Sequence, residues 1–324
     1  MASPSSFFGI GIVSILLVLT KAKATVPIFV LGDSLADNGN NNNLNVPLLD
    51  KSNFAHNGID FPGRIATGRF SNGFNGVDYI ARFLGFPIGP PPYSTTTELN
   101  QMLRGVNFAS AGSGIQDYTG PGTINMTTQI KNFQKVAQLL QQALGQNRAE
   151  HIIATSMFII VHSTLDVSLQ SWRKEFLYSW YRTSRLCTIP NKPKSRRDLH
   201  RHIEPAFYEV QHNCLSESES TEFTASRNEI YSYSNIYRMT SDIIENPILF
   251  GITDVQNACC GNGKFNGEVQ CTTNVTYCHN RNDHFYWDWF HPTQAVYKIT
   301  SQMAFFDSLI YSTPISIQQL VMGI

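Results

Sequence analysis

Short apolar runs alternate with amphipathic segments along most of the chain. Four runs have the length of buried strands, and they cover residues 27–31, 105–109, 157–161 and 230–233. Apolar residues recur at helical spacing in four further segments, 77–84, 128–144, 236–245 and 293–311. Strands that alternate with helices are typical of a mostly parallel sheet with helices on both faces. We therefore predict an α/β protein, built as a single three-layer α/β/α domain.

The segment 128–144 has the clearest helical pattern. A threonine lies at its start and Gly145 follows its end, which are residue types expected at helix caps. Residues 36–45 show the opposite character, because they are too polar and too rich in Asn for a core. We predict a loop or a ligand-facing turn there.

The first 24 residues form a separate unit. Residues 7–19 are an apolar run that is too short to span a bilayer comfortably, and the small-x-small sequence Ala22-Lys23-Ala24 follows it. This pattern predicts a secretory signal peptide over 1–24, cleaved after Ala24, with a buried N-terminal helix as the alternative. The folded domain then covers 25–324.

Further features favour export. The sequons Asn125-Met126-Thr127 and Asn274-Val275-Thr276 make Asn125 and Asn274 candidate glycosylation sites. No later stretch of 18 apolar residues follows the leader, so we expect no stable membrane insertion after processing. The prediction is a secreted, extracellular protein.

Six cysteines fit this compartment, and they are Cys187, Cys214, Cys259, Cys260, Cys271 and Cys278. In a secreted chain they are disulfide candidates with fifteen possible full pairings. Buried thiols remain an alternative for Cys187 and Cys214. Paired C-x-x-C spacings are absent, so we expect no metal site.

Charge excludes one class of partner and marks one unusual segment. With 24 basic and 24 acidic residues the formal net charge is zero, so no overall field attracts nucleic acid. Residues 182–228 are highly polar and contain the basic run 192–202. A solvated loop is the favoured interpretation of that run over a phosphate-binding patch.

Two short motifs carry candidate chemistry. Gly32-Asp33-Ser34-Leu35 follows a predicted buried strand, which exposes a Ser hydroxyl at the carboxyl edge of the sheet. A Ser hydroxyl needs a general base to act as a nucleophile, and Asp288 and His291 stand three residues apart near the other end of the chain. The carboxylate can orient the imidazole while the imidazole takes the Ser proton. The G-x-S-x-G elbow of α/β-hydrolases is absent around Ser34.

These motifs belong to a longer series of blocks, which lie at 29–42, 58–62, 67–73, 105–114, 258–263 and 287–293. In this order they resemble the plant-type GDSL-motif esterases and lipases of the SGNH hydrolase superfamily. The resemblance implies an SGNH-like fold with Ser34 as nucleophile, His291 as base and Asp288 as the orienting carboxylate. It also implies an oxyanion hole built from the backbone N–H groups of Ser34 and Gly112.

The implied activity is that of a secreted serine-dependent carboxylic-ester hydrolase. It would act through an acyl-enzyme on small-molecule, lipid-like or acetylated esters, with no metal and no organic cofactor. Acyl transfer to an alcohol other than water is an alternative that the same triad supports.

Two segments depart from the family pattern. The third block, normally Gly-x-Asn-Asp, is replaced by residues 162–166, which lack the Asn that donates to the oxyanion. Loss of one such donor costs about 10²–10³ in turnover, and Thr164 or His162 is the substitute donor that we consider. Residues 182–228 are atypical where the family supplies another strand. A protein that binds a ligand without turnover is therefore the other alternative.

Overall fold

The computed structural model describes residues 26–114, 116–161, 231–307 and 309–323. The predictions of a signal peptide over 1–24 and of an atypical segment over 182–228 lie outside these residues. So do Thr164, the divergent third block, Cys187 and Cys214.

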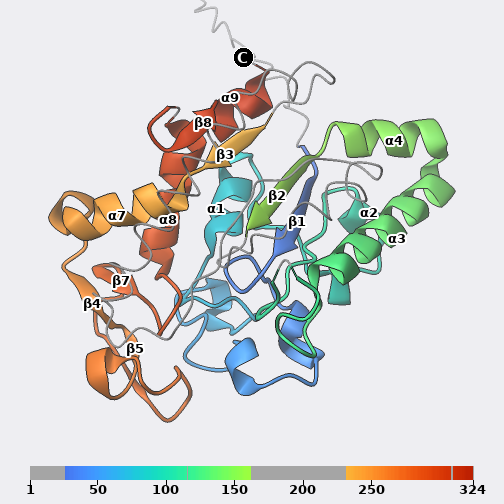
Figure 1. Ribbon diagram of the computed structural model, residues 1–324. Coiled ribbons are helices and arrows are strands. Elements are labelled where there is room, and N and C mark those ends of the chain that lie inside the picture. The colour runs from blue at the N-terminus through green and yellow to red at the C-terminus, as the bar shows by residue number, and fades with distance from the viewer. Residues whose placement is uncertain (1–25, 115, 162–230, 308, 324) are drawn as a thin grey trace, which may run out of the picture.

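Helices and short strands follow one another through the described parts of the chain (Figure 1). The helices are α1 (Gly76–Phe83), α2 (Leu99–Met102), α3 (Met126–Leu144), α4 (Gln146–Ala154), α7 (Ile236–Glu245), α8 (Gln294–Phe306) and α9 (Ile317–Met322). The strands are β1 (Ile28–Gly32), β2 (Met157–Val161), β3 (Ser232–Ser234), β4 (Asp254–Ala258), β5 (Cys260–Gly261), β6 (Thr276–Tyr277), β7 (His284–Tyr286) and β8 (Ser312–Pro314).

Parallel and antiparallel strand pairs both occur in the described residues. β1 pairs in parallel with β2, and β4 pairs in parallel with β7. β3 pairs with β8 and β5 with β6 in antiparallel fashion. These elements form an α/β protein, as the alternation of strands and helices predicted.

Helices pack against both faces of the β1–β2 pair. Successive strand residues point to opposite faces, and those of β1 are apolar on both, so each face needs a helix to cover it. Phe29 packs against Phe133 and Val136 of α3 on one face. On the other face, Ile28 and Val30 pack with Val77 and Ala81 of α1, among other residues. Figure 1 shows α1 and α8 on one side of this pair and α3 and α4 on the other.

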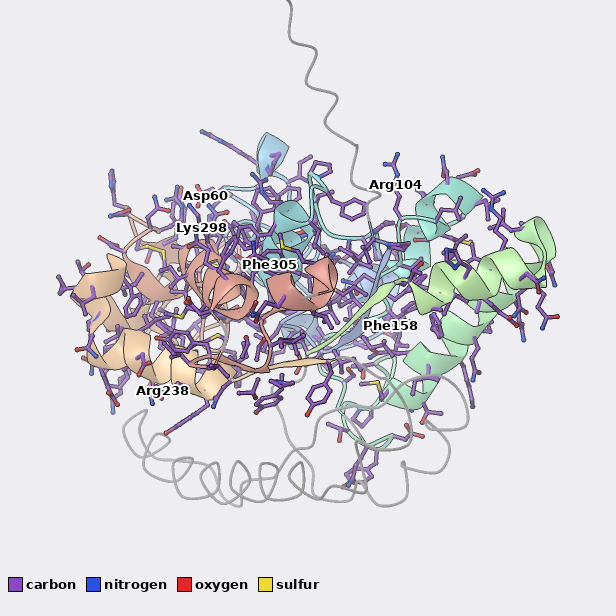
Figure 2. All side chains as sticks on the ribbon, turned by 90° about the horizontal axis from the view of Figure 1, so that it is seen from above. Asp60, Arg104, Phe158, Arg238, Lys298 and Phe305 are labelled. Atoms are coloured by element: carbon purple, nitrogen blue, oxygen red, sulfur yellow. A yellow bond between two sulfur atoms is a disulfide. The ribbon has the colours of Figure 1, made fainter. Side chains whose placement is uncertain are left out.

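The core is rich in aromatic contacts around β1 and β2. Phe158 of β2 meets Phe133 of α3 edge to face with ring centroids 5.2 Å apart, and in Figure 2 it lies beside α3. Phe29 lies 5.3 Å from the same ring. A second cluster joins α7 and α8 through Met239, Ile243, Val296 and Met303. The C-terminal half of the described chain thus has its own apolar centre.

The strand predicted over 105–109 is not formed as such. Asn107 makes only isolated bridges to Val30 and Pro92. Its side chain donates to the Ala36 carbonyl at 2.7 Å and accepts the Ala109 N–H at 2.9 Å. The backbone of this segment does bond to β1, since the Val30 N–H donates to the Val106 carbonyl and the Phe108 N–H donates to the Val30 carbonyl. The Gly32 N–H, which would continue the pairing, donates to the Gln129 side chain instead, so no regular strand forms.

Two predicted helix boundaries also need correction. α3 begins at Met126 rather than 128, because the Asn125 side chain accepts the Thr128 N–H at 2.9 Å and caps the helix. α8 ends at Phe306 and not at 311. The Ser312 hydroxyl donates to the Ala304 carbonyl at 3.1 Å, and residues 312–314 pair with β3 instead.

A buried ion pair anchors α1 to the loop before it. The Arg69 side chain donates through Nε and Nη2 to the two Asp78 carboxylate oxygens at 2.7 and 2.9 Å. The Asp78 side chain is completely buried and the Arg69 side chain is 6% exposed. Asp78 also accepts the N–H groups of Asn75 and Gly89. Removal of either partner leaves an uncompensated buried charge.

We therefore expect Arg69→Ala to lower the free energy of unfolding by about 3–5 kcal/mol. Arg238→Ala is the matched control, because Arg238 pairs with Asp242 at 2.8 Å with 59% of its side chain exposed, at the outer surface of α7 (Figure 2). Its expected cost is below about 1 kcal/mol. Urea denaturation of both variants measures the difference, and equal costs would contradict the assignment of Arg69 as a buried anchor.

Candidate active site

Ser34 lies on a tight turn directly after β1. The N–H groups of Ala36 and Asp37 bond back to the Asp33 carbonyl at 3.1 and 2.9 Å, which closes the turn. At Gly32 an added Cβ would lie 2.2 Å from the Val161 carbonyl oxygen of β2. Only glycine permits this close approach, and it brings the Ser34 turn to the carboxyl end of the β1–β2 pair.

Asp288 and His291 lie on a compact loop between β7 and α8. The Trp287 N–H donates to the His291 carbonyl at 2.7 Å and closes the loop. Asp288 Oδ1 accepts the N–H groups of Phe290 and His291, both at 2.8 Å. Thr293 then caps α8 by accepting the Val296 N–H. The Asp288 carboxylate thus stabilises the loop that places it beside His291, by accepting the N–H groups of that loop.

The structure brings the three predicted catalytic side chains together. Ser34 Oγ lies 2.8 Å from His291 Nε2, although 257 residues separate the two in sequence. His291 Nδ1 lies 2.9 Å from both carboxylate oxygens of Asp288. The His291 ring also packs against the Phe70 ring at 4.6 Å. The His291 and Asp288 side chains are only 10% and 16% exposed.

The charge on Asp288 sets the orientation of the imidazole. Burial raises the pKa of the Asp288 carboxyl, but the neighbouring His291 and the N–H groups of residues 290 and 291 outweigh it and hold the pKa below its ordinary value. The ionised carboxylate only accepts hydrogen bonds, so Nδ1 carries its proton toward Asp288. Nε2 is then free to accept the proton of the Ser34 hydroxyl.

Gly112 lies on a second turn that packs against the end of β1. The Ser110 N–H and the Ser113 hydroxyl both donate to the Gly32 carbonyl at 3.0 Å. Gly112 has φ +78°, and an added Cβ would lie 2.6 Å from Asp50 Oδ1. Among the described residues, the N–H groups of Ser34 and Gly112 meet no acceptor. These are the two N–H groups that the sequence predicts to form the oxyanion hole.

The Asn-rich run after Ser34 is buried as far as Asn41, which corrects the prediction that residues 36–45 are too polar for the core. Asn40 and Asn41 are 1% and 2% exposed. The Asn40 side chain donates to the carbonyls of residues 107 and 109, and the Asn41 side chain donates to the Ala111 carbonyl. Amide side chains can satisfy buried backbone groups in this way where no ladder is available.

Asp37 completes this buried scaffold, in a role that was not predicted from the sequence. Its carboxylate accepts the N–H groups of Gly39 and Asn40 at 2.7 Å and that of Ala111 at 3.0 Å. The Ala111 bond ties the Ser34 segment to the turn that carries Gly112. The available signal was a carboxylate three residues after the predicted nucleophile. Burial raises the pKa of Asp37 to about 6, against the opposing effect of these N–H donors.

The raised pKa predicts a specific pH dependence of stability. In the unfolded chain an Asp titrates near about 3.9, so between that value and about 6 the folded state binds the extra proton. Asp37 therefore contributes stability at low pH that is lost as the pH rises through about 6. From pH 5 to 7 the loss is about 1 kcal/mol.

Asp37→Asn tests this sign, because an amide does not titrate. Urea denaturation between pH 5 and 8 should show the wild type losing stability relative to the variant as the pH rises. A difference that stays constant, or that runs the other way, would contradict the assignment.

Two disulfides support the loop that carries Asp288 and His291. The structure pairs Cys259 with Cys278 and Cys260 with Cys271, out of the pairings that the sequence left open. These cysteines pack around Trp287, which is fully buried. The Trp287 indole N–H donates to Asn57 Oδ1 at 2.8 Å. Trp287, the residue before Asp288, is thereby held by both apolar contacts and a hydrogen bond.

The remaining predicted sites fall in different environments. Asn125 caps α3, and Asn274 is exposed just before β6. In the described part of the chain, no group of three or more His, Cys, Asp or Glu side chains is arranged to hold a metal ion. None of the helices described is long and apolar enough to cross a membrane.

Comparison with known proteins agrees with the motifs. The family model described as GDSL-like Lipase/Acylhydrolase matches residues 28–167. GDSL esterase/lipase At1g71250 of Arabidopsis thaliana is 30% identical over an alignment that covers 94% of this chain and 91% of that protein. GDSL esterase/lipase At1g71691 and GDSL esterase/lipase 7 of the same plant are 32% and 31% identical. Their alignments cover 93% and 90% of this chain, and 87% and 91% of the two relatives.

The chain therefore belongs to the GDSL esterase/lipase family, which confirms the family predicted from its sequence blocks.

Proposed function

We propose that the protein is a serine-dependent carboxylic-ester hydrolase with Ser34, His291 and Asp288 as its catalytic residues. The observation that carries the proposal is the continuous hydrogen-bonded chain from Ser34 Oγ through the imidazole to the Asp288 carboxylate. This is the arrangement that makes a Ser hydroxyl nucleophilic at neutral pH. Its short distances favour an enzyme over a protein that binds without turnover.

Acylation follows from the positions of these groups. His291 Nε2 takes the hydroxyl proton while Ser34 Oγ bonds to the ester carbonyl carbon, and the carbonyl oxygen becomes an oxyanion. The N–H groups of Ser34 and Gly112 donate to that oxygen, where the negative charge develops. When the intermediate collapses, the ester C–O bond breaks and the imidazolium gives its proton to the departing alcohol. Ser34 is left acylated.

Deacylation repeats the steps with water. His291 Nε2 takes a proton from the water as its oxygen attacks the acyl carbon, and the proton returns to Ser34 Oγ when the acid departs. The side chains thus end in their starting protonation states. Thr164 stays our proposed third donor to the oxyanion, in place of the Asn of the family pattern.

Exposed aromatic side chains beside the triad favour a lipid-like acyl group. Trp289 and Phe290 lie between Asp288 and His291 and are 52% and 71% exposed. An acyl chain that packs on such rings removes apolar surface from water on both partners. We infer a preference for apolar esters, without a metal or an organic cofactor.

The remaining predictions form part of the same proposal. Two sequons and two disulfides support passage through the secretory pathway, with residues 1–24 as the signal peptide. The helices on both faces of the β1–β2 pair support a single three-layer α/β/α domain over 25–324.

The first test of this function is hydrolysis of p-nitrophenyl butyrate by purified protein and by Ser34→Ala. We expect the variant to lose at least about 10³-fold in turnover, because its remaining groups supply no nucleophile. A serine-directed fluorophosphonate probe should label the wild type and not the variant. Equal rates and equal labelling in the two proteins would contradict the proposal.

A second test concerns the acyl group. Phe290→Ala should lower kcat/KM for p-nitrophenyl octanoate by about tenfold, the equivalent of about 1.4 kcal/mol of lost apolar contact. The acetate ester, whose acyl group has little apolar surface to bury on the ring, should change less than about twofold.

Leu249→Ala is the control for this test. Leu249 is 82% exposed but precedes β4, at the end of the β4–β7 pair opposite to the Asp288 loop. It should change neither rate. If Phe290→Ala altered both esters equally, the aromatic pair would have no role in acyl selection.

A further inference from the structure

Gln129 is a buried amide that the proposed chemistry does not use. It lies in the first turns of α3, and its side chain has no solvent exposure. Its Oε1 accepts the Gly32 N–H at 2.9 Å. Its Nε2 donates to the carbonyls of Gly32 at 2.9 Å and Ile124 at 2.8 Å, with the Ser113 hydroxyl at 3.2 Å. Every polar atom of the amide is therefore engaged.

The Gln129 amide takes the place of a strand partner at the end of β1. Alternate residues of β1 donate to the 104–110 segment, with Ile28 bonding to Arg104 and Val30 to Val106. Continuation of this pattern would send the Gly32 N–H to residue 108. Instead it bonds to Gln129 Oε1. A side-chain amide has the same donor and acceptor groups as a peptide, so it can complete the ladder.

One carbonyl joins the two turns that carry the proposed oxyanion donors. The Gly32 oxygen accepts the Ser110 N–H, the Ser113 hydroxyl and Gln129 Nε2. Gly32 lies two residues before Ser34, and Ser110 and Ser113 bracket Gly112. Gln129 bonds to both turns, because it contacts Gly32 before Ser34 and also the Ser113 hydroxyl next to Gly112.

We propose that Gln129 is a positioning residue, which holds the Ser34 turn and the Gly112 turn at the separation that one oxyanion requires. The inference rests on the proposed function of Ser34 and Gly112. Catalytic geometry is sensitive to displacements of about 1 Å, which can cost about 10²-fold in rate. Gln129 is fully buried behind the two turns, so we expect its effect to fall on turnover and not on binding.

Gln129→Met separates positioning from packing, because Met has a similar volume and no amide. We expect kcat for p-nitrophenyl butyrate to fall about 10²-fold while KM changes less than about threefold. Leu140→Ala is the matched control on the same helix. It creates a cavity in the core beneath α3 and costs about 2–5 kcal/mol, but it contacts none of the Gly32 groups. At a temperature where both variants are folded, it should keep kcat within about twofold.

Gln129→Glu provides a readout that a merely structural role would not move. A neutral carboxyl can accept the Gly32 N–H and donate to one carbonyl, whereas an ionised one would turn only acceptors toward the Gly32 and Ile124 oxygens. The ratio of its kcat to that of the wild type should therefore rise as the pH falls from 8 to 5.5. A flat ratio would contradict the proposal. If Gln129→Met fails to fold, the pH dependence of Gln129→Glu tests the proposal on its own.

Amide hydrogen exchange tests the role of Gln129 without relying on esterase activity. Exchange in the peptide over residues 30–36 should be faster in Gln129→Met than in the wild type, and unchanged in Leu140→Ala. Inactive wild type with this exchange pattern would contradict the proposed function but not the link between Gln129 and the Ser34 turn. A folded Gln129→Met protein with wild-type kcat would overturn the inference.

Discussion

The hydrogen bonds at Gly32, the carboxyl end of β1, are the interaction on which the rest of the candidate site depends. The Val161 carbonyl of β2 occupies the space that a side chain at residue 32 would need, so only glycine fits there. The Gly32 carbonyl in turn accepts three hydrogen bonds from two other segments. Buried backbone groups are costly when unpaired. This requirement forces the turns of Ser34 and Ser110–Ser113 and the start of α3 into one arrangement. The site is thus a consequence of satisfying one buried strand end.

The other half of the site is supported by covalent and apolar constraints. Two disulfides surround Trp287, whose indole N–H is bonded to Asn57. Asp288 then organises its own loop through two backbone N–H groups before it holds the imidazole. Buried amides and the Asp37 carboxylate fix the Ser34 side, whereas the His291 side combines the Asp288 carboxylate with two disulfides and a packed indole.

Much of the site could be predicted from the sequence, and the misses share one cause. Ser34, Asp288 and His291 follow local motifs, and the structure brings their side chains together as predicted. The helix over 236–245 was predicted to the residue, because apolar spacing and caps act within a few residues. The strand over 105–109 did not form as predicted because the Gly32 N–H, which would continue its pairing with β1, donates to the distant Gln129 side chain. Asn40, Asn41 and Gln129 were missed because polar side chains are expected outside unless a distant partner satisfies them.

The sequence by itself determined the family, the proposed nucleophile and its proposed partners, and most helix positions. Those depend on residue type and on spacing over a few residues, which act through local hydrogen bonds and apolar periodicity. Only the tertiary structure decided which cysteines pair, which amides are buried, and that Ser34 Oγ lies within hydrogen-bond distance of an imidazole 257 residues away. Such contacts are set by the simultaneous packing of distant segments, which no local pattern records.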